Sequence, residues 1–343
     1  MATTPDDVTY QSDQTTTGVN DMTSSSSSRG IAFYYEIAVV FVGVVGTAAN
    51  ALILYAMVVS KQHRKQMLIF NQNVLDLVSS IFLVITYGAK LCSIPLSAST
   101  GYWLCMWLLS ENILWCPILA AKLSLMLVTV ERYLKVVHRA LSKKMLRKWV
   151  IYSVVAFSWI AGFALSIGIT LSTTDLVDGV CLSYVFWSSR ASQLAYGIFY
   201  FTFFYGVILL TFVFCYGRIL TMIRGQARTM AAHSTTVSSQ QSQTSRAQTS
   251  IIKTMVLVSA FYAVSEMPMQ VYYLLLNVNT NMTIIESGYY VSLFVSFLYI
   301  CTNPFIYAAK FDPVKRVLLS LIPCRKTFDE QQTEGPTGTG TAP

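Results

Sequence analysis

Three charged side chains lie inside long apolar stretches of the sequence, where an ionic group is unfavourable. Lys122 lies within "ILAAKLSL", Glu266 within "FYAVSEMP" and Asp76 within "NVLDLV". A charge in hydrocarbon costs about 3 kcal/mol or more, so it marks an ion pair, an ion pathway or a binding site. The sequence contains no nucleophile–base pair, metal-ligand spacing or phosphate-binding loop, so no enzyme activity, metal site or cofactor is predicted.

The elements that must position these charges are seven apolar blocks. The chain has 343 residues, of which 54% are hydrophobic and 12% are charged, whereas soluble domains are about 25% charged. Each block reaches the length of about 20 residues that a helix needs to cross a bilayer. The blocks occupy roughly residues 31–59, 67–91, 104–130, 149–172, 194–222, 251–276 and 286–309. The predicted fold class is therefore an all-α membrane protein, a seven-transmembrane helix bundle in the lipid bilayer.

Two terminal segments flank the predicted bundle. Residues 1–30 are rich in Ser, Thr and Asp, and they lack the basic start and apolar middle of a signal peptide. We expect this segment to be a disordered extracellular tail, because it has little apolar surface to bury. The membrane domain then covers residues 31–322, and residues 323–343 form a cytoplasmic tail.

The positive charges indicate how the bundle is oriented. The formal net charge is +8, and most of the Lys and Arg residues follow spans one, three, five and seven. The opposite side carries only Arg29, Lys90 and Arg190. The positive-inside rule therefore places the N-terminus outside and the C-terminus in the cytosol. This distribution argues against nucleic acid as a partner.

Cysteines and one sequon provide candidate modification sites. Cys105 and Cys181 lie on the predicted outer side, where disulfides persist, so a bridge between them is plausible. Cys92 also lies near that face and is the competing partner. Asn281 begins an N-glycosylation sequon in the predicted outer loop between spans six and seven. Cys324 follows a short amphipathic stretch on the cytosolic side and is a palmitoylation candidate.

Short motifs recur through the spans in a fixed order. They are Asn50 in "GTAANALILY", Asp76 in "NVLDLV", Glu131, Arg132 and Tyr133 in "VERYLKVVHR", Trp159, Pro268, and Asn303, Pro304 and Tyr307 in "TNPFIYAAKF". Together with the outer cysteine pair, this set resembles the rhodopsin-like (class A) G-protein-coupled receptors. The resemblance covers about residues 31–322, including a short amphipathic helix from about Asp312 to Leu321.

The resemblance implies a G-protein switch at the inner end of the bundle. Arg132 would be held by Glu131 in the resting state and released toward the G protein on activation. Tyr216 and Tyr307 would swing inward to support the active state. The full set that the resemblance implies is Glu131, Arg132, Tyr133, Tyr216, Asn303, Pro304 and Tyr307.

The resemblance also implies roles for residues nearer the outer end. Asn50, Asp76 and Asn303 would form a polar core beneath a ligand pocket. Cys105 and Cys181 would join the outer end of span three to the second outer loop.

The sequence departs from the family pattern in the middle of the membrane. Glu266 stands two residues before Pro268, where the family usually has tryptophan, and Lys122 lies at the depth of Asp76, about 15 Å along the helix from Arg132. Spans three and six face each other at that level in this family. We therefore hypothesise that Lys122 and Glu266 form an interhelical ion pair that acts as a resting-state latch within the polar core. Two alternatives are that Asp76 pairs with Lys122, and that Glu266 is protonated and bonded to a hydroxyl.

The resemblance narrows the class of ligand. Amine receptors carry an aspartate at the position of Leu114, and Glu111, one turn further out, is either a substitute or a water-facing residue. Opsins need a lysine in span seven, and residues 293–300 contain none. The segments "ERYLKVVH" and "RKWVIYSVVAFSWIAG" are similar to those of peptide receptors, so we predict a peptide ligand, with a non-peptide small molecule as the alternative. A transporter or channel is disfavoured because no internal repeat is present.

The predicted partners follow from the receptor class. A plasma-membrane receptor of this kind would activate a heterotrimeric G protein. The connection from about Gly225 to Thr249 is rich in Ser, Thr and Gln, so we expect it to be flexible. Its hydroxyl groups are candidate sites for receptor kinases and, once phosphorylated, for arrestin.

Overall fold

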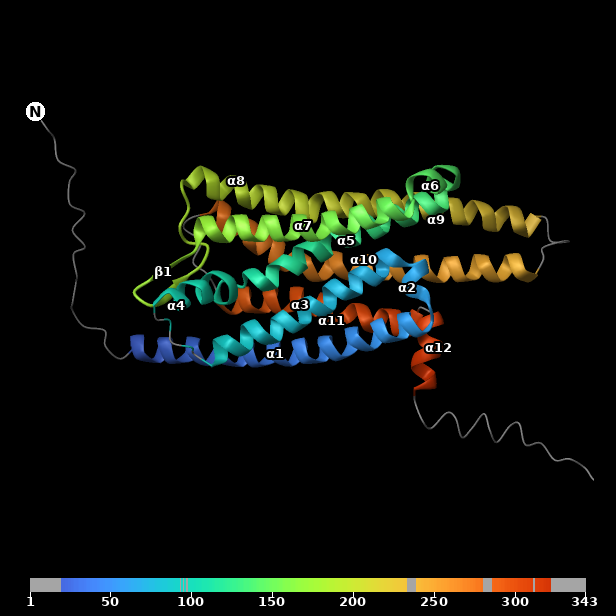
Figure 1. The fold of residues 1–343 in the computed structure, drawn as a ribbon. Helices are drawn as coiled ribbons and strands as arrows, with labels where there is room; N and C mark the ends of the chain where they lie inside the picture. The colour runs from blue at the N-terminus through green and yellow to red at the C-terminus, as the bar shows by residue number, and fades with distance from the viewer. Residues whose placement is uncertain are drawn as a thin grey trace, which may run out of the picture.

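The fold is a bundle of long helices that run side by side (Figure 1). The computed structural model describes residues 20–92, 94, 96, 98–232, 239–279, 286–310 and 312–321. The long helices are α1 (Asn20–Val59), α3 (Met67–Leu91), α5 (Asn112–Val137), α7 (Lys148–Thr173), α9 (Ile208–Ala232), α10 (Ser239–Val278) and α11 (Glu286–Lys310). The short helices are α2 (Gln62–Lys65), α4 (Ala98–Leu104), α6 (Arg139–Met145), α8 (Arg190–Phe201) and α12 (Asp312–Ser320), with π-helical turns η1 (Cys105–Leu109) and η2 (Thr202–Val207).

Seven helical segments of the described chain are long and apolar enough to cross a membrane. They are Gly30–Val59, Met67–Leu91, Ser99–Val137, Lys148–Thr173, Arg190–Gly225, Ile251–Val278 and Ser287–Ala309. These segments match the seven predicted blocks, so the predicted fold class is confirmed. The third segment combines α4, η1 and α5, and the fifth combines α8, η2 and α9.

Some helices continue beyond their apolar segments. α1 begins at Asn20, within the stretch expected to be a disordered tail. α9 continues to Ala232 and α10 begins at Ser239, so much of the connection expected to be flexible is helical. An existing helix gains one hydrogen bond for each residue added, and Ala, Gln and Arg in these extensions are compatible with helix. The prediction of a flexible connection rested on composition alone and did not consider that helices can extend beyond the membrane-spanning segments.

The third span is broken near its N-terminal end. Glu111 adopts left-handed backbone angles (φ 62°) between η1 and α5. Its carbonyl oxygen accepts hydrogen bonds from the backbone nitrogens of Leu114 (3.0 Å) and Trp115 (2.9 Å), which begins the new helix. The break changes the direction of the chain, so the segment before it reaches the loop that carries Cys181.

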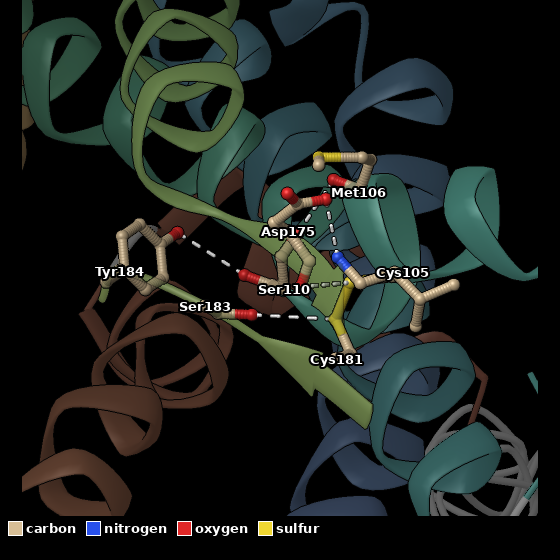
Figure 2. The surroundings of a disulfide bond; sticks show 8 residues. Cys105, Met106, Ser110, Asp175, Cys181, Ser183 and Tyr184 are labelled. Atoms are coloured by element: carbon tan, nitrogen blue, oxygen red, sulfur yellow. Dashed lines mark hydrogen bonds between the residues drawn. A yellow bond between two sulfur atoms is a disulfide. The ribbon is translucent and has the colours of Figure 1, made fainter. Parts of the chain in front are cut away.

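A disulfide fastens this loop to the third span (Figure 2). Strands β1 (Asp175–Val177) and β2 (Val180–Leu182) form an antiparallel hairpin in which Leu176 lies opposite Cys181. Cys181 is bonded to Cys105, while Cys92 is an exposed free thiol. This is the predicted pairing. The candidate modification sites Asn281 and Cys324 lie outside the described residues.

The hairpin and α2, α6 and α12 mark opposite ends of the bundle (Figure 1). We call these the hairpin end and the Arg132 end, because Arg132 lies near the last turn of α5 beside α6. α12 corresponds to the predicted amphipathic helix and turns away from the bundle axis, and its own residue Val314 is fully buried. α5 packs against α3, α7 and α9 and is thus central to the bundle.

Candidate functional site

A cavity of about 740 Å³ opens among the helices at the hairpin end. Its walls come from α5, α7, α8, α10 and α11, and the hairpin loop contributes Cys181, Ser183 and Tyr184. Lys122 and Glu266 are among the lining residues deepest in the bundle. Two of the three charges that the sequence singled out therefore belong to this cavity.

Lys122 and Glu266 form a buried ion pair between α5 and α10. Lys122 Nζ donates to Glu266 Oε2 at 2.6 Å, and each side chain is 2% exposed. Glu266 Oε2 also accepts from Gln270 Nε2 at 3.1 Å, and Oε1 accepts from the Ser296 hydroxyl at 2.6 Å. The structure therefore contains the hypothesised interhelical pair, and α11 joins it through Ser296.

A second ion pair lies nearer the mouth of the cavity. Lys90 Nζ lies 2.5 Å from Glu111 Oε1, which also accepts from the Tyr87 hydroxyl at 2.9 Å. Glu111 Oε2 accepts from Trp115 Nε1 at 3.1 Å. Glu111 thus faces protein donors rather than open water. The pairing of Glu111 with Lys90 was not predicted from the sequence, because the two residues lie on different spans and no regular sequence spacing relates them.

Aromatic hydroxyls dominate the rest of the wall. Tyr196, Tyr200 and Tyr273 contact one another through their rings, with centroid separations of 5.3 to 6.5 Å. In the loop, the neutral phenol of Tyr184 donates to the carbonyl of Ser110 at 3.3 Å, and burial raises its pKa further above the ordinary value. The wall therefore offers many neutral hydrogen-bonding groups set in apolar surroundings.

Asp76 lies in a separate polar layer beneath the cavity. Its carboxylate accepts from Asn303 Nδ2 at 2.8 Å and from Gln72 Nε2 at 3.2 Å. Among the described residues, no Lys or Arg lies within 4.0 Å of it, so Lys122 is not its partner. Asn50 Nδ2 donates to the carbonyls of Gly46 (2.9 Å) and Ile300 (3.3 Å). This layer joins α1, α3 and α11.

Trp159 also contributes to the polar layer rather than only packing. Its indole nitrogen donates to Asn71 Oδ1 at 3.0 Å, and Asn71 Nδ2 donates to the Ser124 hydroxyl at 3.2 Å. These bonds join α7, α3 and α5. The sequence supplied Trp159 as a family marker but did not indicate Asn71 as its partner.

Arg132 is held at the Arg132 end of the bundle by two side chains. It lies 3.1 Å from Glu131 Oε2, as the resemblance implied. Its Nη2 also donates to Gln66 Oε1, a contact that the sequence did not indicate. Glu131 accepts in addition from Lys135, four residues further along α5. The arginine is thus bound from α5 and from the start of α3.

The remaining residues of the expected switch lie near Arg132 or in the adjoining helices. The Tyr216 hydroxyl lies 3.1 Å from the hydroxyls of Thr129 and Ser259, so it bridges α9, α5 and α10. Tyr307 is buried, Pro304 lies within α11, and the Tyr133 hydroxyl is 3.0 Å from His138 Nε2.

Comparison with known proteins identifies the family. A model of the "7 transmembrane receptor (rhodopsin family)" matches residues 49–307, which is most of the chain. The crystal structure of squid rhodopsin is similar in fold, with a TM-score of 0.69 over 91% of this chain and 93% of that chain, at 16% sequence identity. No curated protein matches the sequence. The described residues contain no grouping of His, Cys, Asp or Glu suited to a metal ion. The chain is a multi-pass membrane protein and belongs to the rhodopsin family of seven-transmembrane receptors, which are not enzymes.

Proposed function

We propose that this receptor is activated by an extracellular peptide and activates a heterotrimeric G protein. The hairpin end faces the outside of the plasma membrane and the Arg132 end faces the cytosol. This orientation rests on the basic residues, which gather in and around α2, α6 and α12. Coupling to heterotrimeric G proteins is the common property of the family to which the chain belongs.

The cavity is the observation that supports a peptide. Glu111, which immediately precedes α5, lies near the mouth of the cavity, and Lys122 of α5 lies near its floor. The two are eleven residues apart, or about 16 Å of helical rise. An extended chain of about five residues has that length. The lining also carries Gln193, Gln270 and Asn277 among its tyrosines, which suits a ligand with many amide groups.

Contacts between helices offer a route from the cavity to Arg132. The ion pair at the floor joins α5 to α10, and Tyr216 joins the same two helices again through Thr129 and Ser259. Thr129 is three residues before Arg132 on α5. A ligand that shifts α10 against α5 therefore disturbs both contacts at once, and the second is adjacent to the switch arginine.

Phosphorylation of the cytosolic connection would end the signal. The cytosolic connection, residues 225–249, carries many Ser and Thr residues. Phosphate groups on these hydroxyls add negative charge that a basic surface of arrestin can bind. Receptor kinases and arrestin are accordingly proposed as further partners.

A ligand screen in intact cells tests the proposal. Cells that express the receptor are exposed to peptide and non-peptide libraries, and activation of several G-protein classes is recorded. Cells that express Arg132→Ala at the same surface level serve as the matched control. Peptide agonism that requires Arg132 supports the proposal. Agonists found only among non-peptides overturn the ligand class, and ion or solute flux without G-protein activation overturns the receptor mechanism.

A further inference from the structure

The two carboxylates that line the cavity are already fully engaged. Glu111 accepts hydrogen bonds from Tyr87, Lys90 and Trp115. Glu266 accepts from Lys122, Gln270 and Ser296, and so has two donors besides its cation. A cationic group on a ligand would have to displace one of these donors from either carboxylate.

Lys122 has fewer alternatives than its partner. Glu266 is the only carboxylate within 4.0 Å of its ammonium among the described residues. The other close groups are the rings of Trp115 and Tyr200, whose centroids lie 5.9 and 5.8 Å from Nζ and which line the cavity. The neutral side chain of Tyr200 also forms a hydrogen bond with the ammonium. Asp76 is bound to Gln72 and Asn303 instead. Losing Glu266 therefore leaves the lysine without an anionic partner.

This difference between Lys122 and Glu266 determines whether the floor of the cavity accepts an anionic or a cationic group of a ligand. A ligand cation that captured Glu266 would strand Lys122 as an unpaired buried charge, which is strongly unfavourable. A ligand anion that captured Lys122 would leave Glu266 with the hydrogen bonds from Gln270 and Ser296. The cationic lining residues, Lys90, Lys122 and Arg190, also outnumber the two carboxylates.

We propose that Lys122 is the anchoring site for a carboxylate of the ligand, which exchanges with the carboxylate of Glu266. This inference rests on the proposed function and narrows its ligand class to molecules that bring a carboxylate to the cavity floor. In a peptide the group is the C-terminal carboxylate or an Asp or Glu side chain near the inserted end. The exchange separates α10 from α5, because the pair that joins them is replaced by a contact between α5 and the ligand.

Acetate tests whether Lys122 is an anion site open to the cavity. The purified full-length receptor with Glu266→Ala lacks the internal carboxylate, and acetate can take its place. We expect acetate to raise the thermal unfolding midpoint of this variant by about 2–4 °C at ten times its Kd. Chloride at equal ionic strength and acetamide at equal concentration should have no such effect.

The double variant Lys122→Met/Glu266→Ala is the matched control. It keeps the space left by Glu266 but has no ammonium, so acetate should not raise its midpoint. No shift in Glu266→Ala, or an equal shift in the double variant, would overturn the proposal. If Glu266→Ala cannot be purified, Glu266→Gln serves for the same titration, because it removes the charge and keeps the size of the side chain.

The readout separates this proposal from the signalling proposal. Unfolding of purified protein does not depend on a G protein or on a known agonist. Failure of the peptide screen would leave the acetate result intact, and a missing acetate effect would leave G-protein coupling standing.

Discussion

The side-chain oxygen of Gln66 accepts a hydrogen bond from Nη2 of Arg132. Gln66 occupies the N-cap position of α3, and its own backbone nitrogen donates to the carbonyl of Gln62 at 2.8 Å. Arg132 is therefore tied to the start of the second span as well as to Glu131 beside it. We propose that this contact from the start of the second span helps to restrain Arg132 in the resting state.

Gln66→Leu should raise basal G-protein activation. A hydrogen bond to a charged group contributes about 1.5–3 kcal/mol, so its loss from the resting state shifts the balance toward the active state by about 10- to 150-fold. Basal signalling at matched surface expression measures the effect. Gln62→Leu, one helical turn earlier, is the control, and equal basal activity in the two variants would contradict the role of Gln66.

Arg132→Ala should abolish agonist-dependent signalling while surface expression stays near that of the wild type. Arg132 lies near the end of α5 and is 6% exposed, so its removal affects the Arg132 end of the bundle and not the cavity. Arg139→Ala, which changes an exposed arginine on α6, should retain coupling. Normal coupling by a well-expressed Arg132→Ala receptor would refute the assignment.

Charge reversal tests the latch between α5 and α10. Lys122→Glu and Glu266→Lys each place two like charges in contact, and each should cost about 3–5 kcal/mol of stability or more. The double swap restores opposite charges. It should therefore recover part of the lost expression and return basal signalling toward the low level of the wild type. Lys144→Glu on exposed α6 controls for the change in net charge. A double swap no better than the worse single variant would show that the pair is not a latch.

The disulfide should be essential for expression of the folded receptor. Cys105 and Cys181 are 76 residues apart, and a bridge across such a loop contributes up to about 4–5 kcal/mol in soluble proteins. Cys105→Ser and Cys181→Ser should therefore lower surface expression, whereas Cys92→Ser should not. Mass mapping without reduction should find the Cys105–Cys181 peptide pair, and a bridge to Cys92 would disprove the pairing.

Gly162 allows α7 to approach α5 closely. A Cβ atom there would lie 2.6 Å from the carbonyl oxygen of Cys116 and 2.7 Å from the backbone nitrogen of Ala120. Gly162→Ala should thus destabilise the receptor by about 1–3 kcal/mol, as overpacking does elsewhere. Gly168→Ala on the same helix has no atom within 4 Å of the new Cβ and should be neutral or slightly stabilising. Thermal unfolding of the two variants distinguishes these outcomes.

Much of the fold follows from the sequence, because a bilayer imposes one length and one polarity on every span. The pair of Lys122 and Glu266 could be predicted for a related reason: two buried charges of opposite sign at one depth have few other ways to be stabilised. Its contact with Ser296 could not, since a serine in an apolar helix usually bonds to its own backbone.

Other features depend on backbone conformation, which the spacing of apolar residues in the sequence does not specify. The left-handed turn at Glu111 is a local event within a long apolar block. The polar run of Ser110, Glu111 and Asn112 interrupts the apolar pattern there, but these residue types do not specify the backbone angles. Gln66 lies in a polar connection, where its contact with Arg132 depends on how two helix ends meet. Contacts of this kind depend on how the spans pack together, and no regular pattern in the sequence indicates them.

The pairing of Lys122 with Glu266 has a consequence for biosynthesis. The two residues are 144 positions apart, so the lysine enters the translocon well before its partner has been made. At about 5–20 residues per second, the third span waits roughly 7–30 s for the sixth. During that time it carries an unpaired ammonium near its middle, which makes release into lipid unfavourable. We therefore expect the third span to stay beside the translocon or an insertion chaperone until the sixth span arrives, and a chain truncated before Glu266 to be cross-linked there.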